Sequence, residues 1–230
     1  MVCENYKYIK KELEETAIRC GRNPEEITLI AVSKTKPLSD IEKLISIGVK
    51  DFGENKVQEL CSKYEEVSKP VDFHLIGHLQ TNKVKYIVDK ACLIHSVDSL
   101  KLAKEIQKEA IKKDVIAHIL IEVNVAQEES KFGLSVEEVI PLVEEISKLS
   151  NVHVNGLMTI APFVENPEEN RKYFKALKQL SLDITSKNID NIDMNVLSMG
   201  MTNDYKVAIE EGATMVRVGT AIFGTRNYSI

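Results

Sequence analysis

Short apolar runs alternate with longer amphipathic runs along the chain, and this alternation restricts the fold more than any other feature. In the longer runs the apolar residues fall on one helical face, as Ile41, Leu44 and Ile45 do. Because parallel strands need crossover helices between them, the alternation predicts a parallel sheet. Eight strand–helix units, preceded by a helix at about 4–20, predict an α/β fold: a (β/α)8 TIM barrel with an extra N-terminal helix. The predicted strands are 27–33, 50–53, 72–77, 92–97, 115–125, 153–160, 194–199 and 214–219.

The loop after the first predicted strand argues against the main alternative, an open doubly wound sheet. A dinucleotide-binding sheet of that kind needs GxGxxG at this position, whereas this chain has SKTKP at 33–37. The 230 residues contain no Gly/Ser-rich or Pro-rich linker, and single α/β barrels reach this length. We therefore expect one domain over residues 1–230, and a self-contained barrel of this size is expected to be a monomer.

Charge and cysteine content restrict the classes of partner. The net charge of −5 argues against a general affinity for nucleic acid or for an anionic membrane. No segment approaches the ~20 apolar residues that span a bilayer, and the charged N-terminus does not resemble a signal peptide. The four cysteines form no CxxC pair, which is typical of reduced thiols. We expect a cytoplasmic protein that binds neither nucleic acid nor membrane.

Lys34 is the first candidate site residue, because it stands where an apolar strand opens into a loop. Its stem could lie along the barrel rim while its ammonium group reaches water. In barrels of this type, however, catalytic and ligand-binding residues gather at the carboxyl ends of the strands. The position of Lys34 therefore favours a functional role.

Polar residues also follow the second and third predicted strands. Glu54 and Asn55 follow the second, where they could cap the next helix. His74 and His78 in the third lack the HExxH context, and the neighbouring residues are poor zinc ligands. We therefore predict no metal site.

Small and hydroxyl residues follow the seventh and eighth predicted strands. The first of these turns supplies Ser198, Gly200 and Thr202, and the second supplies Gly219 and Thr220. Small residues let the backbone approach an anion closely, and hydroxyl and backbone N–H groups donate to its oxygens. Barrels often bind phosphate in these two loops. The alternative is a pair of ordinary tight turns with helix caps.

Arg217 is unexpected in an apolar strand. It lies between Val216 and Val218, so strand alternation points it away from both valines and into the barrel. A guanidinium group keeps its proton there and needs acceptors. Those acceptors could be Glu54 or Glu122, in a structural ion pair, or they could belong to a ligand.

A lysine amine, a phosphate pocket and an inward arginine together fit pyridoxal 5′-phosphate (PLP). A lysine can condense with its aldehyde as a Schiff base, while the phosphate loops hold the ring in place. A lyase or aldolase that uses Lys34 with a phosphorylated sugar is an alternative from the same residues.

The sequence closely resembles the YggS/PROSC family of pyridoxal phosphate homeostasis proteins. The resemblance rests on AVSKTKP, FGENKVQE, FHLIGHLQTNK, IEVNVAQEESKFGL, GLMTIAP and LSMGMTNDYKVAIEEGATMVRVGTAIFG, in this order along nearly the whole chain. It implies a fold type III PLP-binding barrel similar to the N-terminal domain of alanine racemase. It also implies a Schiff base on Lys34 and an Arg217 directed to the pyridine nitrogen. Phosphate contacts would come from Ser198, Gly200, Gly219 and Thr220, and Asn55 and Met158 would line the pocket.

The resemblance implies a non-enzymatic role in PLP homeostasis, in which the protein holds PLP and releases or transfers it to PLP-dependent apoenzymes. Guanidinium is a very weak acid, so Arg217 would leave the pyridine nitrogen unprotonated and disfavour carbanion chemistry. A PLP-dependent amino-acid racemase is the alternative. Racemisation by two bases needs a second acid/base, commonly from another domain, whereas this chain ends at GTRNYSI soon after its last predicted strand.

Overall fold

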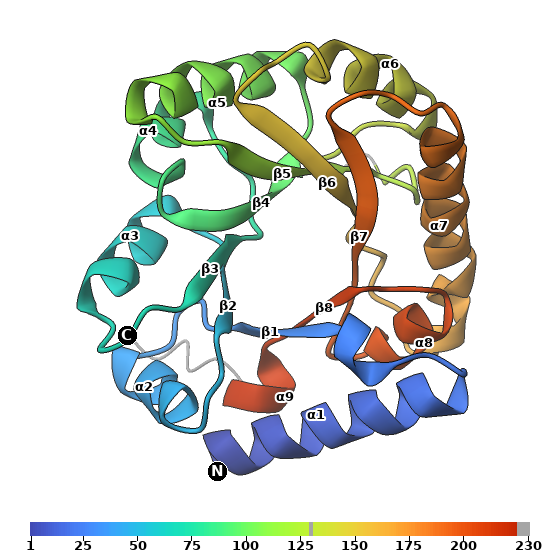
Figure 1. Cartoon of the computed structure of the whole chain (residues 1–230). Helices are drawn as coiled ribbons and strands as arrows, with labels where there is room; N and C mark the ends of the chain where they lie inside the picture. The colour runs from blue at the N-terminus through green and yellow to red at the C-terminus, as the bar shows by residue number, and fades with distance from the viewer. Residues whose placement is uncertain (129–130, 225–230) are drawn as a thin grey trace.

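Eight parallel strands form a closed barrel in the computed structural model, which describes residues 1–128 and 131–224. The strands follow one another around the barrel in chain order, and β8 pairs with β1 (Figure 1). The predicted TIM barrel is therefore confirmed, and the open doubly wound sheet is wrong. The strands are β1 (Thr28–Val32), β2 (Asp51–Glu54), β3 (Asp72–Leu75), β4 (Ala91–Val97), β5 (Ala117–Glu122), β6 (Val152–Met158), β7 (Ile192–Met201) and β8 (Met215–Val218).

Helices surround the barrel between successive strands (Figure 1). The α-helices are α1 (Val2–Arg19), α2 (Leu38–Ser46), α3 (Val57–Glu66), α4 (Val84–Ile87), α5 (Leu100–Lys113), α6 (Val136–Ile146), α7 (Arg171–Ser186), α8 (Tyr205–Glu210) and α9 (Thr220–Phe223). The short 3-10 helices of the described residues are η1 (Pro24–Glu26), η2 (Thr81–Lys83) and η3 (Pro167–Asn170). Within the described ranges no helix is both long and apolar enough to cross a membrane.

Most strands end one or two residues from the predicted position, and the largest difference is at β5. β5 ends at Glu122 instead of 125, because the chain turns and Asn124 N donates to Leu134 O at 2.8 Å. β7 continues to Met201 instead of 199.

The side chains of each strand alternate between two packing environments. Val216 and Val218 belong to the large apolar core between the strands and the helices, while Arg217 lies on the opposite side. Leu93, Leu120 and Met158 form a small separate apolar cluster. The inward orientation predicted for Arg217 is confirmed by this alternation.

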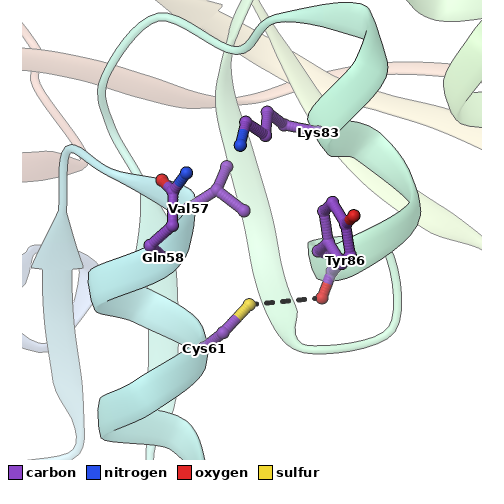
Figure 2. Close-up of a pocket in the computed structure, with 5 residues that line it drawn as sticks. All are labelled: Val57, Gln58, Cys61, Lys83 and Tyr86. Atoms are coloured by element: carbon purple, nitrogen blue, oxygen red, sulfur yellow. Dashed lines mark hydrogen bonds between the residues drawn. The ribbon is translucent and has the colours of Figure 1, made fainter.

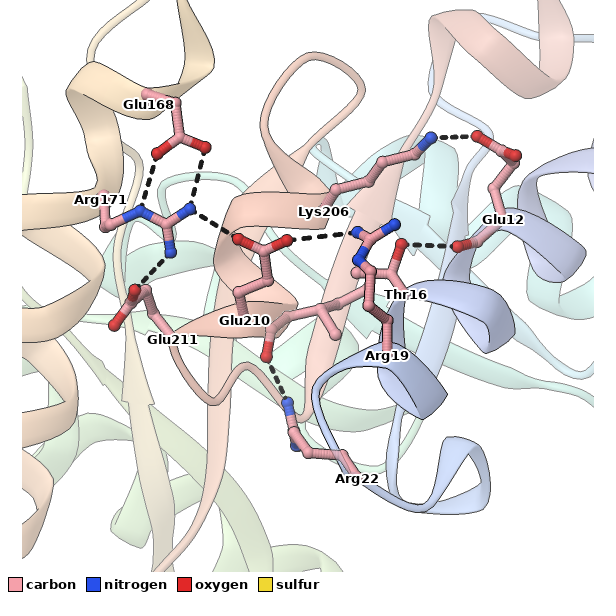
Figure 3. Close-up of polar contacts among 10 residues, drawn as sticks. Glu12, Thr16, Arg19, Arg22, Glu168, Arg171, Lys206, Glu210 and Glu211 are labelled. Carbon is pink, nitrogen blue, oxygen red and sulfur yellow. Dashed lines mark hydrogen bonds and ion pairs between the residues drawn. The ribbon is translucent and has the colours of Figure 1, made fainter.

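The extra N-terminal helix packs on the outer surface of the barrel. Its apolar face buries Leu13 and Ala17, and it contacts α2, α8 and α9 (Figure 1). Polar contacts fix its far end: Arg22 Nη1 donates to Ile209 O at 2.7 Å and to Ala213 O at 2.8 Å. An ion pair between Arg19 and Glu210, at 3.2 Å, lies beside them (Figure 3). The helix therefore supports α8 and α9, which follow the last two strands.

Candidate functional site

A cavity of about 570 Å³ opens at the carboxyl ends of the strands. Its walls come from the ends of β1, β2 and β8 and from the loops after β6 and β7. Its volume falls within the range of about 300–1,000 Å³ that is usual for small-molecule sites. The predicted site residues that line it are Lys34, Asn55, Thr202, Arg217, Gly219 and Thr220.

The other three predicted site residues are buried and are not among the described residues of the cavity wall. They are Met158, Ser198 and Gly200. Met158 packs against Leu93 and Leu120. The Ser198 hydroxyl is engaged by Arg217 and by His95. These residues therefore shape the site from behind its surface.

The backbone beside Lys34 is held by a buried polar cluster. Ser33 Oγ donates to Glu54 Oε1 at 2.6 Å, and Ser33 O accepts from Lys63 Nζ at 2.8 Å. Lys63 Nζ also contacts Glu54 Oε1 and Glu59 Oε1, each at 2.7 Å. We call Ser33, Glu54, Glu59 and Lys63 the inner cluster. It fixes the end of β1, from which Lys34 enters the cavity.

The inner cluster corrects one sequence interpretation. Glu54 does not cap α3, whose N-cap is Lys56 and has no side-chain cap hydrogen bond. Burial raises the pKa of Glu54, and the positive charge of Lys63 opposes that rise. Sequence reasoning did not identify Lys63 as part of the site, because its contacts with Ser33 and Glu54 form only in the folded barrel. The available signal was a lysine on the helix face that also carries Val57 and Leu60.

Arg217 is held by neutral acceptors. Its side chain donates from Nη1 to Ser198 Oγ at 2.6 Å and from Nη2 to Thr159 O at 2.8 Å. Burial lowers the pKa of Arg217 to about 10, so the group is still charged at neutral pH. No ion pair between Arg217 and Glu54 or Glu122 occurs among residues 1–128 and 131–224. Within the described residues, Asp204 and Glu122 therefore act on Arg217 through their charge but form no ion pair with it.

The loops after β7 and β8 bring hydroxyl groups and a glycine to the cavity. Thr202, Gly219 and Thr220 line it. Gly200 has φ +90°, and a Cβ there would lie 2.5 Å from Ala208 Cβ. Only glycine therefore lets β7 pass this close to α8.

Hydrogen bonds fix the loop that carries Thr202. The buried Asp204 accepts from Met201 N at 2.7 Å and from Asn170 Nδ2 at 2.8 Å. Asn203 Nδ2 donates to Val164 O at 2.9 Å, which joins the loops after β6 and β7. The cavity wall is thus formed by loops that are tied to each other.

Asn55 contributes a buried polar atom to the cavity. Its Oδ1 has no hydrogen-bond partner within the described part of the chain. A buried acceptor without a partner is costly, so a ligand donor at this position would stabilise the site.

A second hollow of about 380 Å³ lies between α3 and the η2–α4 segment (Figure 2). Its wall contains none of the predicted site residues, and the Cys61 thiol donates to Tyr86 O at 3.4 Å. Burial raises the pKa of Cys61, which keeps the thiol protonated and weakly nucleophilic. Among residues 1–128 and 131–224 no group of three or more His, Cys, Asp or Glu side chains could hold a metal ion.

Comparisons with known proteins agree on one family. The family described as alanine racemase, N-terminal domain, matches residues 9–227. The pyridoxal phosphate homeostasis protein of Aquifex aeolicus (strain VF5) is 45% identical over 227 residues, which are 98% of this chain and 99% of that protein. The protein of the same name from Escherichia coli (strain K12) is 36% identical over 232 residues, with 99% and 98% covered.

Solved structures give the same relationship. PipY of Synechococcus elongatus PCC7942, with PLP bound, is 30% identical with a TM-score of 0.85, covering 97% of this chain and 100% of that one. An alanine racemase of Clostridium difficile 630 is 16% identical with a TM-score of 0.74, covering 96% of this chain and 57% of that one, and shows the fold alone. The chain therefore belongs to the alanine racemase N-terminal domain family and, within it, to the pyridoxal phosphate homeostasis proteins.

Proposed function

We propose that this protein binds pyridoxal 5′-phosphate in the cavity at the carboxyl end of the barrel, through a Schiff base on Lys34. The observation that carries the proposal is one shared cavity: Lys34, Arg217 and Thr220 all line it. The names of the curated relatives and the PLP-bound PipY structure support the choice of ligand. We further propose that the chain is a non-enzymatic carrier that releases PLP or transfers it to PLP-dependent apoenzymes.

The residues present fit the chemical groups of PLP. Its aldehyde condenses reversibly with a primary amine and releases water. Thr202, Gly219 and Thr220 offer two hydroxyl groups and a turn without a side chain, which suits a phosphate group. Asn55 offers a buried amide oxygen that has no partner among the residues the structure describes.

Arg217 decides what the site can do with a bound pyridine ring. Its guanidinium group would donate a hydrogen bond to the ring nitrogen and keep its own proton. The ring then stays neutral, which weakens its capacity to stabilise a carbanion. This favours holding and releasing the ligand over amino-acid chemistry.

The direct test is borohydride reduction of the protein mixed with PLP, followed by peptide mass spectrometry. Reduction should fix one pyridoxyl group on Lys34. Lys34→Ala should lose this adduct and keep weaker, phosphate-dependent binding through the loops after β7 and β8. Lys43→Ala is the matched control, because Lys43 is an exposed lysine on α2 paired with Asp40. An adduct on another lysine, or a protein that never binds PLP, would refute the proposal.

Two further assays separate the alternatives. A racemase would convert L-alanine or another L-amino acid to its D form at enzyme-like turnover, and we expect no such conversion. A sugar-phosphate lyase or aldolase would stay colourless with PLP, whereas we expect a visible absorbance band that borohydride abolishes. The proposal also includes a single domain over residues 1–230, a monomer and a cytoplasmic location. Light scattering and cell fractionation test the last two.

A further inference from the structure

A chain of hydrogen bonds crosses the inside of the barrel from Arg217 to the opposite end. Arg217 Nη1 contacts Ser198 Oγ at 2.6 Å, and Ser198 Oγ contacts His95 Nδ1 at 2.9 Å. His95 Nε2 contacts His74 Nδ1 at 3.0 Å, and His74 Nε2 contacts Asp51 Oδ1 at 3.1 Å. We call these five residues the interior chain. Each comes from a different strand: β8, β7, β4, β3 and β2.

The interior chain connects the cavity to the far end of the barrel. Arg217 lines the cavity at the carboxyl end, whereas Asp51 is the first residue of β2. The Asp51 side chain is 34% exposed, while His74 is 3% exposed and His95 and Ser198 are fully buried. Only the Asp51 end of the chain therefore reaches solvent directly.

The first link fixes the direction of one hydrogen bond. Guanidinium groups donate and cannot accept, so the Ser198 hydroxyl oxygen accepts from Arg217. The hydroxyl proton is then available for His95 Nδ1, which accepts it when the imidazole is neutral. Burial lowers the pKa of His95, and the positive charge of Arg217 adds to this effect, which keeps the His95 imidazole neutral.

The Asp51 carboxylate, which can only accept, selects the direction of the remaining links. A neutral His95 with an acceptor at Nδ1 carries its proton on Nε2 and donates it to His74 Nδ1. His74 then carries its proton on Nε2 and donates it to the Asp51 carboxylate. With the opposite polarity, a neutral His74 would turn a nitrogen lone pair toward that carboxylate. Every donor in the interior chain therefore points from the cavity toward Asp51.

We propose that His95, supported by His74 and Asp51, is a positioning residue that orients Arg217 for the ligand through the Ser198 hydroxyl. This inference rests on the proposed function, because it assigns the ligand-facing arginine. His95 takes the Ser198 proton, so the hydroxyl oxygen presents its lone pairs to Arg217. Without that acceptor the hydroxyl rotates freely, and of the two acceptors that hold Arg217 only Thr159 O keeps its place.

Nuclear magnetic resonance tests the direction of the interior chain without PLP. Nitrogen-15 shifts of the imidazole rings in the ligand-free protein distinguish the two tautomers. Both His95 and His74 should carry their proton on Nε2. A proton on Nδ1 of either ring at neutral pH would overturn the assigned direction.

Variants of His95 test the effect on the ligand. His95→Leu removes the acceptor, and His95→Asn has a similar shape but keeps an oxygen near the place of Nδ1. We expect His95→Leu to bind PLP about tenfold more weakly, which corresponds to one hydrogen bond to a charged group. Its visible absorbance band should shift as well, while His95→Asn should recover both the affinity and the band. A merely structural role would not produce this spectral recovery.

Controls separate the two proposals. A parent protein that forms no adduct on Lys34 would refute the proposed function. A parent that forms it, with a folded His95→Leu variant of unchanged affinity and absorbance, would refute the positioning role alone. If His95→Leu does not fold, Ser198→Ala tests the same link, because it removes the hydroxyl acceptor of Arg217. Unchanged PLP affinity and absorbance in Ser198→Ala would likewise refute the role.

Discussion

Two clusters of charged side chains tie this barrel together, and they differ mainly in their access to water. The inner cluster beside Lys34 pairs Lys63, 9% exposed, with the fully buried Glu54. On the outer surface Arg171, 27% exposed, contacts Glu168, Glu210 and Glu211 (Figure 3). Lys206 pairs with Glu12 of α1 in the same region (Figure 3). We call these residues, with Arg19, the outer cluster.

The comparison indicates that the contribution of an ion pair to stability depends more on its access to water than on the distance between its charged atoms. Both clusters contain short contacts between a cation and more than one carboxylate. In the outer cluster water can replace a partner that is removed, so each exposed pair contributes little. In the inner cluster Glu54 is fully buried, so without its cation it becomes a buried, uncompensated charge.

Removing the inner cation should have the largest effect. Lys63→Ala leaves Glu54 without its cation and removes one of the two donors to Ser33 O, the other being Lys36 N. We expect a loss of about 3–5 kcal/mol in the free energy of unfolding, measured by urea denaturation. The double variant Glu54→Gln/Lys63→Met should recover most of it, because neither charge is then buried. A loss below about 1 kcal/mol in Lys63→Ala would mean that the inner cluster stabilises the fold no more than an exposed ion pair does.

Glu122 extends the comparison to a buried carboxyl group that has no ion pair among residues 1–128 and 131–224. Burial raises the pKa of Glu122 from 4.5 to about 7; the charge of Asp98 acts in the same direction and that of Arg217 opposes it. The folded protein therefore binds this proton more tightly than the unfolded chain. Its contribution to stability is complete below pH 4.5 and is lost as the pH rises to about 7.

Glu122→Gln removes that titration. Relative to the parent, the variant should gain up to about 3 kcal/mol between pH 4.5 and pH 8, at about 1.4 kcal/mol for each pH unit between the two pKa values. Urea denaturation of both proteins across this range measures the difference, and the parent is the control for all other titrating groups. A difference that stays constant with pH would contradict the raised pKa.

The sequence predicted those features that depend on local periodicity. Strand alternation gave the inward direction of Arg217, and the shared direction of parallel strands brought Lys34 and Thr220 to one cavity. These predictions succeed because each needs only the strand positions and the closure of the barrel.

Features that depend on contacts between different strands and helices could not be predicted from the sequence. The phosphate contact of Ser198 stays a prediction, whereas the contacts of its hydroxyl with Arg217 and His95 were not predicted. His74 and His95 are 21 residues apart and meet only through the pairing of β3 with β4. Strand alternation marks His74, between Phe73 and Leu75, as an inward residue, and His95 follows the apolar Ile94. Which inward residues touch depends on the register and tilt of the closed barrel.

The smallest effect is expected at the outer pair of Lys206 and Glu12. Their side chains are 44% and 22% exposed, so Lys206→Gln should cost less than about 1 kcal/mol. A double-mutant cycle with Glu12→Gln isolates the coupling, which should fall further in 1 M NaCl because the Debye length is then only about 3 Å. The same cycle on Glu54 and Lys63 should give a coupling several times larger that persists at high salt. Equal couplings for the two pairs, or an inner coupling that salt abolishes, would show that water reaches both clusters alike. The inner cluster could then no longer be regarded as the rigid support of Lys34.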